Sequence, residues 1–134
     1  LLAPMRITAL ILGHFLERSG ESAFVNVTSG LAIYPKTTSA VYCATKAGLR
    51  SFSKSLRYQL ESTHVSVFEA VMPIVDTPMT RARARKKMKA EDAARALING
   101  VVSGKSTIYI GISRLIPIVS WISPKIMASI LKRG

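Results

Sequence analysis

Stretches with the composition of strands alternate with stretches that have the spacing of helices, and this alternation constrains the fold more than any other feature. The predicted strands are rich in valine, isoleucine and aromatic residues and cover 23–28, 65–71 and 107–110. The predicted helices repeat apolar residues every three or four positions or begin with acidic residues, and cover 1–19, 41–60 and 91–102. Helix–strand alternation is typical of a parallel sheet covered by helices. The sequence therefore predicts an α/β fold.

The helix over 41–60 carries the clearest pattern in the chain. An apolar residue recurs every three or four positions at Val41, Ala44, Gly48, Phe52, Leu56 and Leu60. Small residues crowd the first half of the helix, so another element can approach it closely there. Thr38 or Ser39 precedes the helix and is placed to cap it.

Tyr42 and Lys46 are four residues apart in this helix, so they share a face. An ammonium group beside a phenol favours the phenolate and lowers a tyrosine pKa from about 10 towards the working pH. Such a tyrosine can give or take a proton at a carbonyl or alcohol oxygen. The alternative is a chance pairing, since a Tyr-x-x-x-Lys pattern alone is a weak signal.

Other polar residues of the chain are predicted to converge on this pair. Ser29 follows the first predicted strand, 75–77 follows the second, and Tyr42 opens the helix between them. In parallel α/β sheets, ligand sites gather at the carboxyl ends of the strands. We therefore expect these residues at one edge of the sheet. Taken singly, Ser29 and Thr77 could each do no more than bond a local backbone group in a turn.

The combination resembles the short-chain dehydrogenase/reductase superfamily. Tyr42 follows Ser29 by thirteen residues, within VNVTSGLA and VYCATKAGL, and the segment VDTPM follows the next strand at 75–79. The resemblance implies a single-domain Rossmann-type fold that binds NAD or NADP and moves a hydride between nicotinamide and a carbonyl or alcohol substrate. It extends over nearly the whole chain, as the C-terminal, catalytic half of the family's domain.

The resemblance also implies a role for each matching residue. Tyr42 would be the general acid/base, and Lys46 would hold the nicotinamide ribose and depress the pKa of Tyr42. Ser29 would position the substrate oxygen. Thr77, with the backbone near Val75, would hold the nicotinamide carboxamide. The expected catalytic residues are thus Ser29, Tyr42 and Lys46, and the expected cofactor contacts are Tyr42, Lys46, Pro73, Val75 and Thr77.

The sequence departs from the family pattern in two places. Met72-Pro73 stands where the family has Pro-Gly, and proline fixes φ and removes an N–H where glycine would be permissive. A Pro-containing loop and an apolar tail are similar to those of the oxidoreductase branch associated with teichoic-acid D-alanylation operons. The sequence also has no glycine-rich dinucleotide-binding turn. We therefore expect residues 1–134 to be an incomplete Rossmann-type domain, and a non-catalytic truncated product is an alternative.

The formal net charge of +12 is concentrated locally, with six basic residues at Arg81, Arg83, Arg85, Lys86, Lys87 and Lys89. Such charge can attract nucleic acid or anionic surfaces. No nucleic-acid-binding signature accompanies it, so no nucleic-acid partner is expected. An anion-binding module that uses 81–89 is an alternative function. By the resemblance, 81–90 is a basic lid or loop beside the cofactor, although solvated charge is the simpler interpretation.

The remaining features bear on partners and location. The apolar tail over 112–134 is interrupted by prolines, which favours a surface-docking helix pair over a membrane span and leaves peripheral membrane contact as a minor alternative. The only cysteine, Cys43, is expected to be a packing residue, and it fits a reducing, cytoplasmic compartment. Neither histidine suggests a metal site. We expect an apolar small-molecule substrate, and a homodimer or homotetramer formed through the helices over 1–19 and 41–60.

Overall fold

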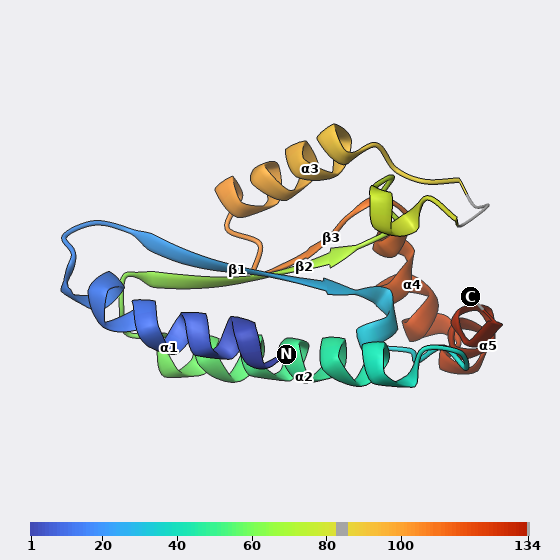
Figure 1. Cartoon of the computed structure of the whole chain (residues 1–134), viewed down its shortest axis with the longest axis horizontal. Helices are drawn as coiled ribbons and strands as arrows, with labels where there is room; N and C mark the ends of the chain where they lie inside the picture. The colour runs from blue at the N-terminus through green and yellow to red at the C-terminus, as the bar shows by residue number, and fades with distance from the viewer. Residues whose placement is uncertain (83–85, 134) are drawn as a thin grey trace.

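The computed structural model describes residues 1–82 and 86–133, which form a parallel sheet between two layers of helices (Figure 1). The strands are β1 (Ser22–Ser29), β2 (Val65–Met72) and β3 (Thr107–Tyr109), in the order β1-β2-β3. Helices α1 (Leu2–Glu17) and α2 (Ala40–Gln59) cover one face, and α3 (Ala90–Val102) covers the other. The predicted α/β fold is confirmed, and the predicted boundaries differ from these by one or two residues.

Three short 3₁₀ turns and two further helices complete the described chain. The turns are η1 (Gly30–Ala32), η2 (Pro78–Thr80) and η3 (Gly111–Arg114), and the helices are α4 (Leu115–Ile122) and α5 (Pro124–Arg133). All three turns follow the carboxyl end of a strand, as do α4 and α5 at one end of the molecule (Figure 1). That end of the sheet therefore carries most of the irregular structure.

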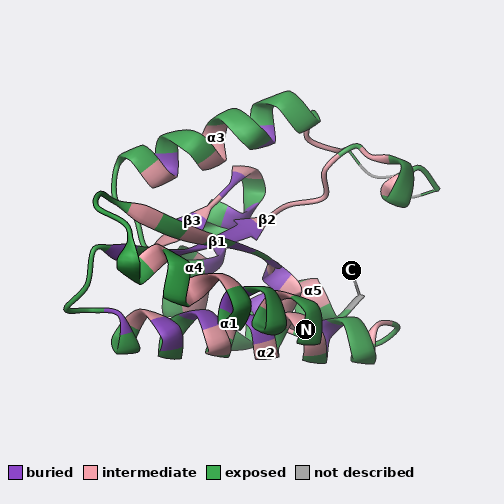
Figure 2. Ribbon diagram, turned by 60° about the vertical axis from the view of Figure 1, so that its left-hand side comes forward, coloured by how far each residue is buried: buried purple, intermediate pink, exposed green. Residues whose placement is uncertain are grey.

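Alternate side chains of β2 build the two halves of the core. Val65 and Val67 pack with Leu56 and Leu60 of the α2 end, on the side that α1 and α2 cover. Phe68 and Ala70, which point the other way, pack with residues of β3 and α3. Figure 2 shows the buried residues gathered on the sheet and on the inward sides of the helices. Because both faces of β2 are covered, its near-continuous apolar sequence is explained.

The close approach of α3 to β3 depends on a glycine in the helix. A Cβ built on Gly100 would lie 2.5 Å from Cγ2 of Ile108, closer than real Cβ contacts come. The helix can therefore rest on the strand only where a side chain is missing. Beside α2, the Leu1 side chain lies 2.8 Å from where a Cβ on Gly48 would be, so this glycine leaves room for that side chain.

Except for Leu12, the residues of α1 that face the core are not those of the apolar stripe that recurs every three or four positions in its sequence. The apolar spacing gave Leu2, Met5, Ala9, Leu12 and Leu16, yet of these only Leu12 is even half-buried. The inward residues are Thr8, which is buried, and Leu12 and Phe15, which pack on the first core cluster. Apolar residues surround this helix on nearly all sides, so spacing alone does not decide which side contacts the sheet. Apart from Leu12, the residues of this apolar stripe are exposed.

The predicted tail helices are present and pack on the end of the sheet. Ile116 of α4 and Met127 of α5 are buried against Val71 of β2. Pro124 occupies the first position of α5, where the missing N–H is not needed for the helix ladder. Over residues 1–82 and 86–133, none of the helices combines the length and the apolar character needed to cross a bilayer.

Candidate active site

Lys46 links helix α2 to strand β1 at the centre of the predicted site. Its Nζ donates a hydrogen bond of 2.8 Å to the carbonyl oxygen of Val27. The same Nζ lies 5.8 Å from the centre of the Tyr42 ring, within the range of a cation–π interaction. One lysine thus contacts both the strand that carries Ser29 and the tyrosine that opens the helix.

Ser29 and Tyr42 both lie on the carboxyl-edge side of the contact between Lys46 and Val27. Ser29 is two residues beyond Val27 along β1, a rise of about 6.6 Å, and Tyr42 is one helical turn before Lys46, a rise of about 6 Å. Both steps lead towards the carboxyl edge of the sheet, since α2 begins there. The Ser29 hydroxyl accepts a hydrogen bond of 3.3 Å from the backbone N–H of Leu31, which orients it at the start of η1.

The surroundings of the two reactive side chains differ. Tyr42 is 43% exposed. Lys46 is half-buried, and this burial lowers the pKa of its amine from the ordinary value, because an ammonium loses solvation there. Tyr42 is accordingly open to a ligand, whereas Lys46 is held beneath it. Ser39 precedes the first residue of α2, at one of the two expected cap positions, but its side chain makes no cap hydrogen bond.

A buried carboxylate beneath the site joins β1, β2 and α2. Glu69 of β2 is buried and accepts a 2.7 Å hydrogen bond from the Thr28 hydroxyl. Both carboxylate oxygens of Glu69 also accept hydrogen bonds from Arg50, at 2.7 and 2.8 Å. Burial by itself would lower the pKa of Arg50, but the hydrogen bonds and negative charge of Glu69, with a contribution from Tyr109, hold that pKa above its ordinary value. The network connects the residue before Ser29 to the turn of α2 after Lys46.

Sequence reasoning missed this network, although one signal was available. Glu69 stands in the middle of an apolar strand, and an acidic residue at such a position is almost always paired when buried. Arg50 lies four residues after Lys46, on the same face of the helix. Spacing therefore allows the pairing, but the choice among the basic residues of the chain requires the fold.

The segment after β2 folds back on itself at the same edge of the sheet. Ser29 and Met72 are paired in the register of β1 and β2, so residues 73–77 leave the sheet at the level of Ser29. Thr77 donates its backbone N–H to Thr80 Oγ1, and the two hydroxyl oxygens are 3.3 Å apart. The Thr80 hydroxyl in turn donates to the carbonyl oxygen of Val75 at 2.6 Å. Thr80, which sequence reasoning did not single out, thus engages both Thr77 and Val75.

Pro73 and the basic residues of 81–89 adjoin this segment. Pro73 packs against Gly111, whose φ of +56° and crowded Cβ position both favour glycine. Val75 forms a parallel bridge with Met88, so the two ends of the intervening loop are held together. Lys87 pairs with Asp76 at 3.3 Å. Arg83 and Arg85, which belong to the predicted lid, lie outside the described residues.

The candidate site lies apart from the cavity beside α3. A cavity of about 600 Å³ lies between α3 and the segment from Lys105 to Pro117, but Ser29, Tyr42 and Lys46 do not line it. Cys43 is buried and its sulfur accepts a hydrogen bond from the N–H of Lys36, which confirms the predicted packing role. Among residues that the structure describes, no group of three His, Cys, Asp or Glu side chains could hold a metal ion.

Comparisons with known proteins identify the family of the chain. The family model of short chain dehydrogenases matches residues 1–88. The chain is 39% identical over 112 residues to the uncharacterized oxidoreductase DltE of Bacillus subtilis (strain 168), a match that covers 79% of this chain and 44% of that protein. It is also 34% identical over 87 residues to the uncharacterized oxidoreductase SERP2049 of Staphylococcus epidermidis, covering 63% of this chain and 38% of that protein.

Among solved structures, a short chain dehydrogenase from Burkholderia cenocepacia J2315 in complex with NADP superimposes with a TM-score of 0.81 at 23% identity, over 95% of this chain and 52% of that one. That likeness supports the fold. The chain spans about half the length, or less, of the relatives and structures that it matches. Because the family model matches residues 1–88, more than half of the sequence, the chain belongs to the short-chain dehydrogenase/reductase family.

Proposed function

We propose that this chain carries the proton-transfer and nicotinamide-binding part of an NAD(P)-dependent oxidoreductase that acts on a carbonyl or alcohol group. The observation that carries the proposal is the position of Lys46, bonded to β1 at Val27 and 5.8 Å from the Tyr42 ring. Membership of the family and the NADP complex of the Burkholderia relative support a nicotinamide cofactor. NAD and NADP both fit these observations.

Tyr42 would act as general acid and base. During reduction its hydroxyl would donate a proton to the substrate oxygen, and during oxidation the phenolate would take that proton back. The ammonium of Lys46 would stabilise the phenolate from beneath. When bound, NAD or NADP supplies or accepts the hydride. Ser29, at the same edge of the sheet, would donate a hydrogen bond from its hydroxyl to the same substrate oxygen and orient it.

The residues present fit a nicotinamide nucleoside. Lys46 has three N–H donors and gives one to Val27, so the others can be donated to ribose hydroxyls. Pro73, Val75 and Thr77 leave the sheet at the level of Ser29, where a nicotinamide ring would lie. To hold the carboxamide, Thr77 would exchange its contacts with Thr80 for the ligand. Thr80 would thus keep the segment ordered before the cofactor binds.

The first test is Tyr42→Phe in the native polypeptide that contains this sequence, after its intact mass has been measured. We expect NAD(P)H-dependent reduction of apolar carbonyl compounds to be abolished while the thermal melt is unchanged. Removing one hydroxyl from an exposed side chain leaves the packing intact. Tyr58→Phe, also exposed and on α2, is the matched control and should retain activity. Activity that survives Tyr42→Phe would disprove the mechanism.

We also propose that two copies associate through α1 and α2, as a homodimer or as part of a homotetramer. The exposed apolar residues of α1 support this, since Leu2 and Leu10 are exposed on that helix and Val41 is exposed on the neighbouring α2. Exposed apolar area of this kind is typical of protein interfaces. Analytical ultracentrifugation tests the proposal: Leu10→Glu should give monomers, and association that is unaffected by Leu10→Glu would contradict it.

A further inference from the structure

The C-terminal helices expose large apolar residues with nothing packed on them among the described residues. We call α4 and α5, Leu115–Arg133, the tail hairpin. Its inner side is buried through Ile116 and Met127. Its outer side exposes six large apolar residues: Leu115, Ile118, Trp121, Ile122, Ile126 and Ile130. In α4 these residues recur at intervals of three and four, so they form one stripe.

The charge of the tail hairpin is of one sign. From residue 114 to the end the sequence has four basic residues and no acidic one: Arg114, Lys125, Lys132 and Arg133. Lys125 and Lys132 are exposed and seven residues apart in α5, so they share a face, beside the apolar pair Ile126 and Ile130. Long basic side chains beside an apolar stripe can extend to anionic groups while the stripe is buried.

The dimensions of the tail hairpin exclude a transmembrane arrangement. Helix α4 has 8 residues and α5 has 10, so each is about 12–15 Å long at the α-helical rise, against a hydrocarbon core of about 30 Å. Such helices can only lie along a membrane. Trp121, 87% exposed at the tip of α4, belongs to the residue type that concentrates at the membrane–water interface.

We propose that the tail hairpin docks on an anionic lipid surface, with its apolar stripe in the interface and its basic residues on the lipid headgroups. Charge favours this occupant over a second copy of the chain. A symmetric contact would bring together the basic residues of two tail hairpins, and 115–133 contain no acidic residue to pair with them. An anionic membrane buries the apolar stripe in its interface and provides negatively charged headgroups for the basic residues.

The chain contains one tryptophan, and it lies in the proposed contact, so intrinsic fluorescence reports docking directly. The protein is titrated at low concentration with vesicles of phosphatidylcholine alone or mixed with phosphatidylglycerol. We expect a blue shift, and quenching by brominated lipid, only with the anionic vesicles, and we expect salt to weaken both.

Two pairs of variants make the test specific, and far-UV circular dichroism first verifies that each variant is folded. Ile118→Ser/Ile122→Ser retains Trp121 and should weaken vesicle binding at least about tenfold, whereas Ile98→Ser/Val102→Ser, equally exposed on α3, should leave it unchanged. Lys125→Glu/Lys132→Glu should weaken binding by about tenfold or more, and Lys54→Glu/Lys105→Glu much less. If a tail variant does not fold, the quenching of Trp121 by brominated lipid in the unaltered protein tests whether the tail hairpin contacts the membrane.

Several results would overturn the proposal. A blue shift that grows with protein concentration and needs no lipid would identify a second copy of the chain as the occupant. A response to polyglutamate but not to vesicles would point to an acidic protein. Equal binding to zwitterionic and anionic vesicles would remove the role of the basic residues. Loss of binding in the α3 variant would show that the contact lies elsewhere. None of these outcomes depends on the cofactor, so the proposed oxidoreductase function is tested separately.

Discussion

At the scale of single residues, the carboxylate of Glu69 is the polar group on which most of the site's geometry depends. It is buried and holds Thr28 on one side and Arg50 on the other. Glu69→Ala would leave Arg50 without its partner, and breaking a buried ion pair costs about 3–5 kcal/mol. Because the Arg50 side chain is 33% exposed, we expect the lower end, a loss of about 3 kcal/mol in the free energy of unfolding.

Urea denaturation measures this loss, and the second ion pair of the described chain provides the control. Asp76 pairs with Lys87, but its side chain is 67% exposed, so Asp76→Ala should cost less than about 1 kcal/mol. Equal losses in the two variants would show that burial of Glu69 does not determine the strength of its pair.

Lys46 should make stability depend on pH in the alkaline range. Burial lowers its pKa in the folded chain below the ordinary 10.5, so the unfolded chain binds more protons between those two values. The free energy of unfolding should therefore rise with pH across this window, relative to a Lys46→Met variant that lacks the amine. NMR titration of the lysine side chain locates the folded pKa. A difference between the two proteins that falls with increasing pH would contradict the sign.

At the scale of elements, the contact of α3 with β3 has almost no free space. A methyl group at Gly100 would meet the Ile108 side chain at 2.5–2.9 Å, so Gly100→Ala should destabilise the fold by about 1–3 kcal/mol through overpacking. Gly13, in α1, has nothing within 4 Å of its Cβ position, and Gly13→Ala should instead stabilise by about 0.5–1 kcal/mol. Thermal melts compare the two. If both variants melted alike, helix propensity and not packing would control α3.

The elements themselves were largely predictable, and the packing of their faces was not. Local composition and spacing identified all three strands and the main helices, since Val-rich runs and capping or stop residues act within a few positions. The inward face of α1 was not predictable, because an apolar helix presents several equivalent stripes and the sheet selects one. Likewise Ser29, Tyr42 and residues 75–77 could be assigned to one edge of the sheet from the succession of strands and helices along the chain. The pairing of Glu69 with Arg50 and the contacts of Thr80 depend on tertiary distances.

At the scale of the whole molecule, the free side of β1 should determine how the chain behaves in solution. The described sheet ends at β1, and Val25 and Val27 are 40% and 42% exposed on it. An apolar edge strand promotes association, which lysine opposes. Val25→Lys should therefore raise the soluble concentration of the chain. Val102→Lys, which adds the same charge on exposed α3, should not. Static light scattering compares them, and an equal effect would assign the change to net charge.

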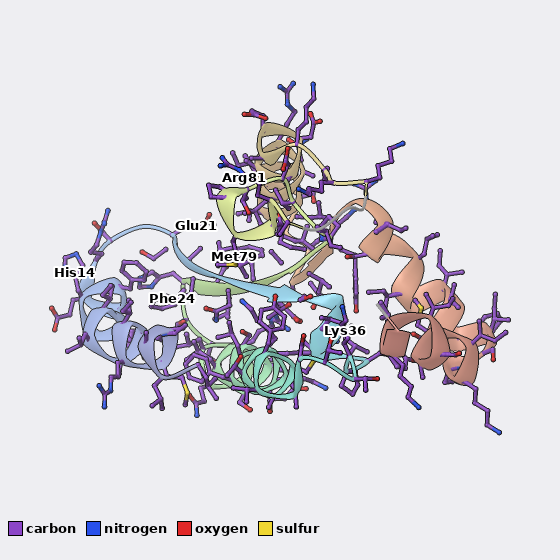
Figure 3. All side chains as sticks on the ribbon, turned by 45° about the vertical axis from the view of Figure 1, so that its right-hand side comes forward. His14, Glu21, Phe24, Lys36, Met79 and Arg81 are labelled. Atoms are coloured by element: carbon purple, nitrogen blue, oxygen red, sulfur yellow. The ribbon has the colours of Figure 1, made fainter. Side chains whose placement is uncertain are left out.

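The loop before α2 and the last turn of α5 are joined by Thr37, which donates both its backbone N–H and its hydroxyl to the carbonyl oxygen of Lys132, at 3.2 and 3.0 Å. Figure 3 shows the neighbouring Lys36 beside the C-terminal helices. The loop leads directly into Tyr42, so this contact joins the candidate active site, on the side of Thr37, to the tail hairpin, on the side of Lys132. Thermodynamic reciprocity then applies: whatever factor tail docking contributes to the affinity of the site for its ligand, occupancy of the site must contribute to docking.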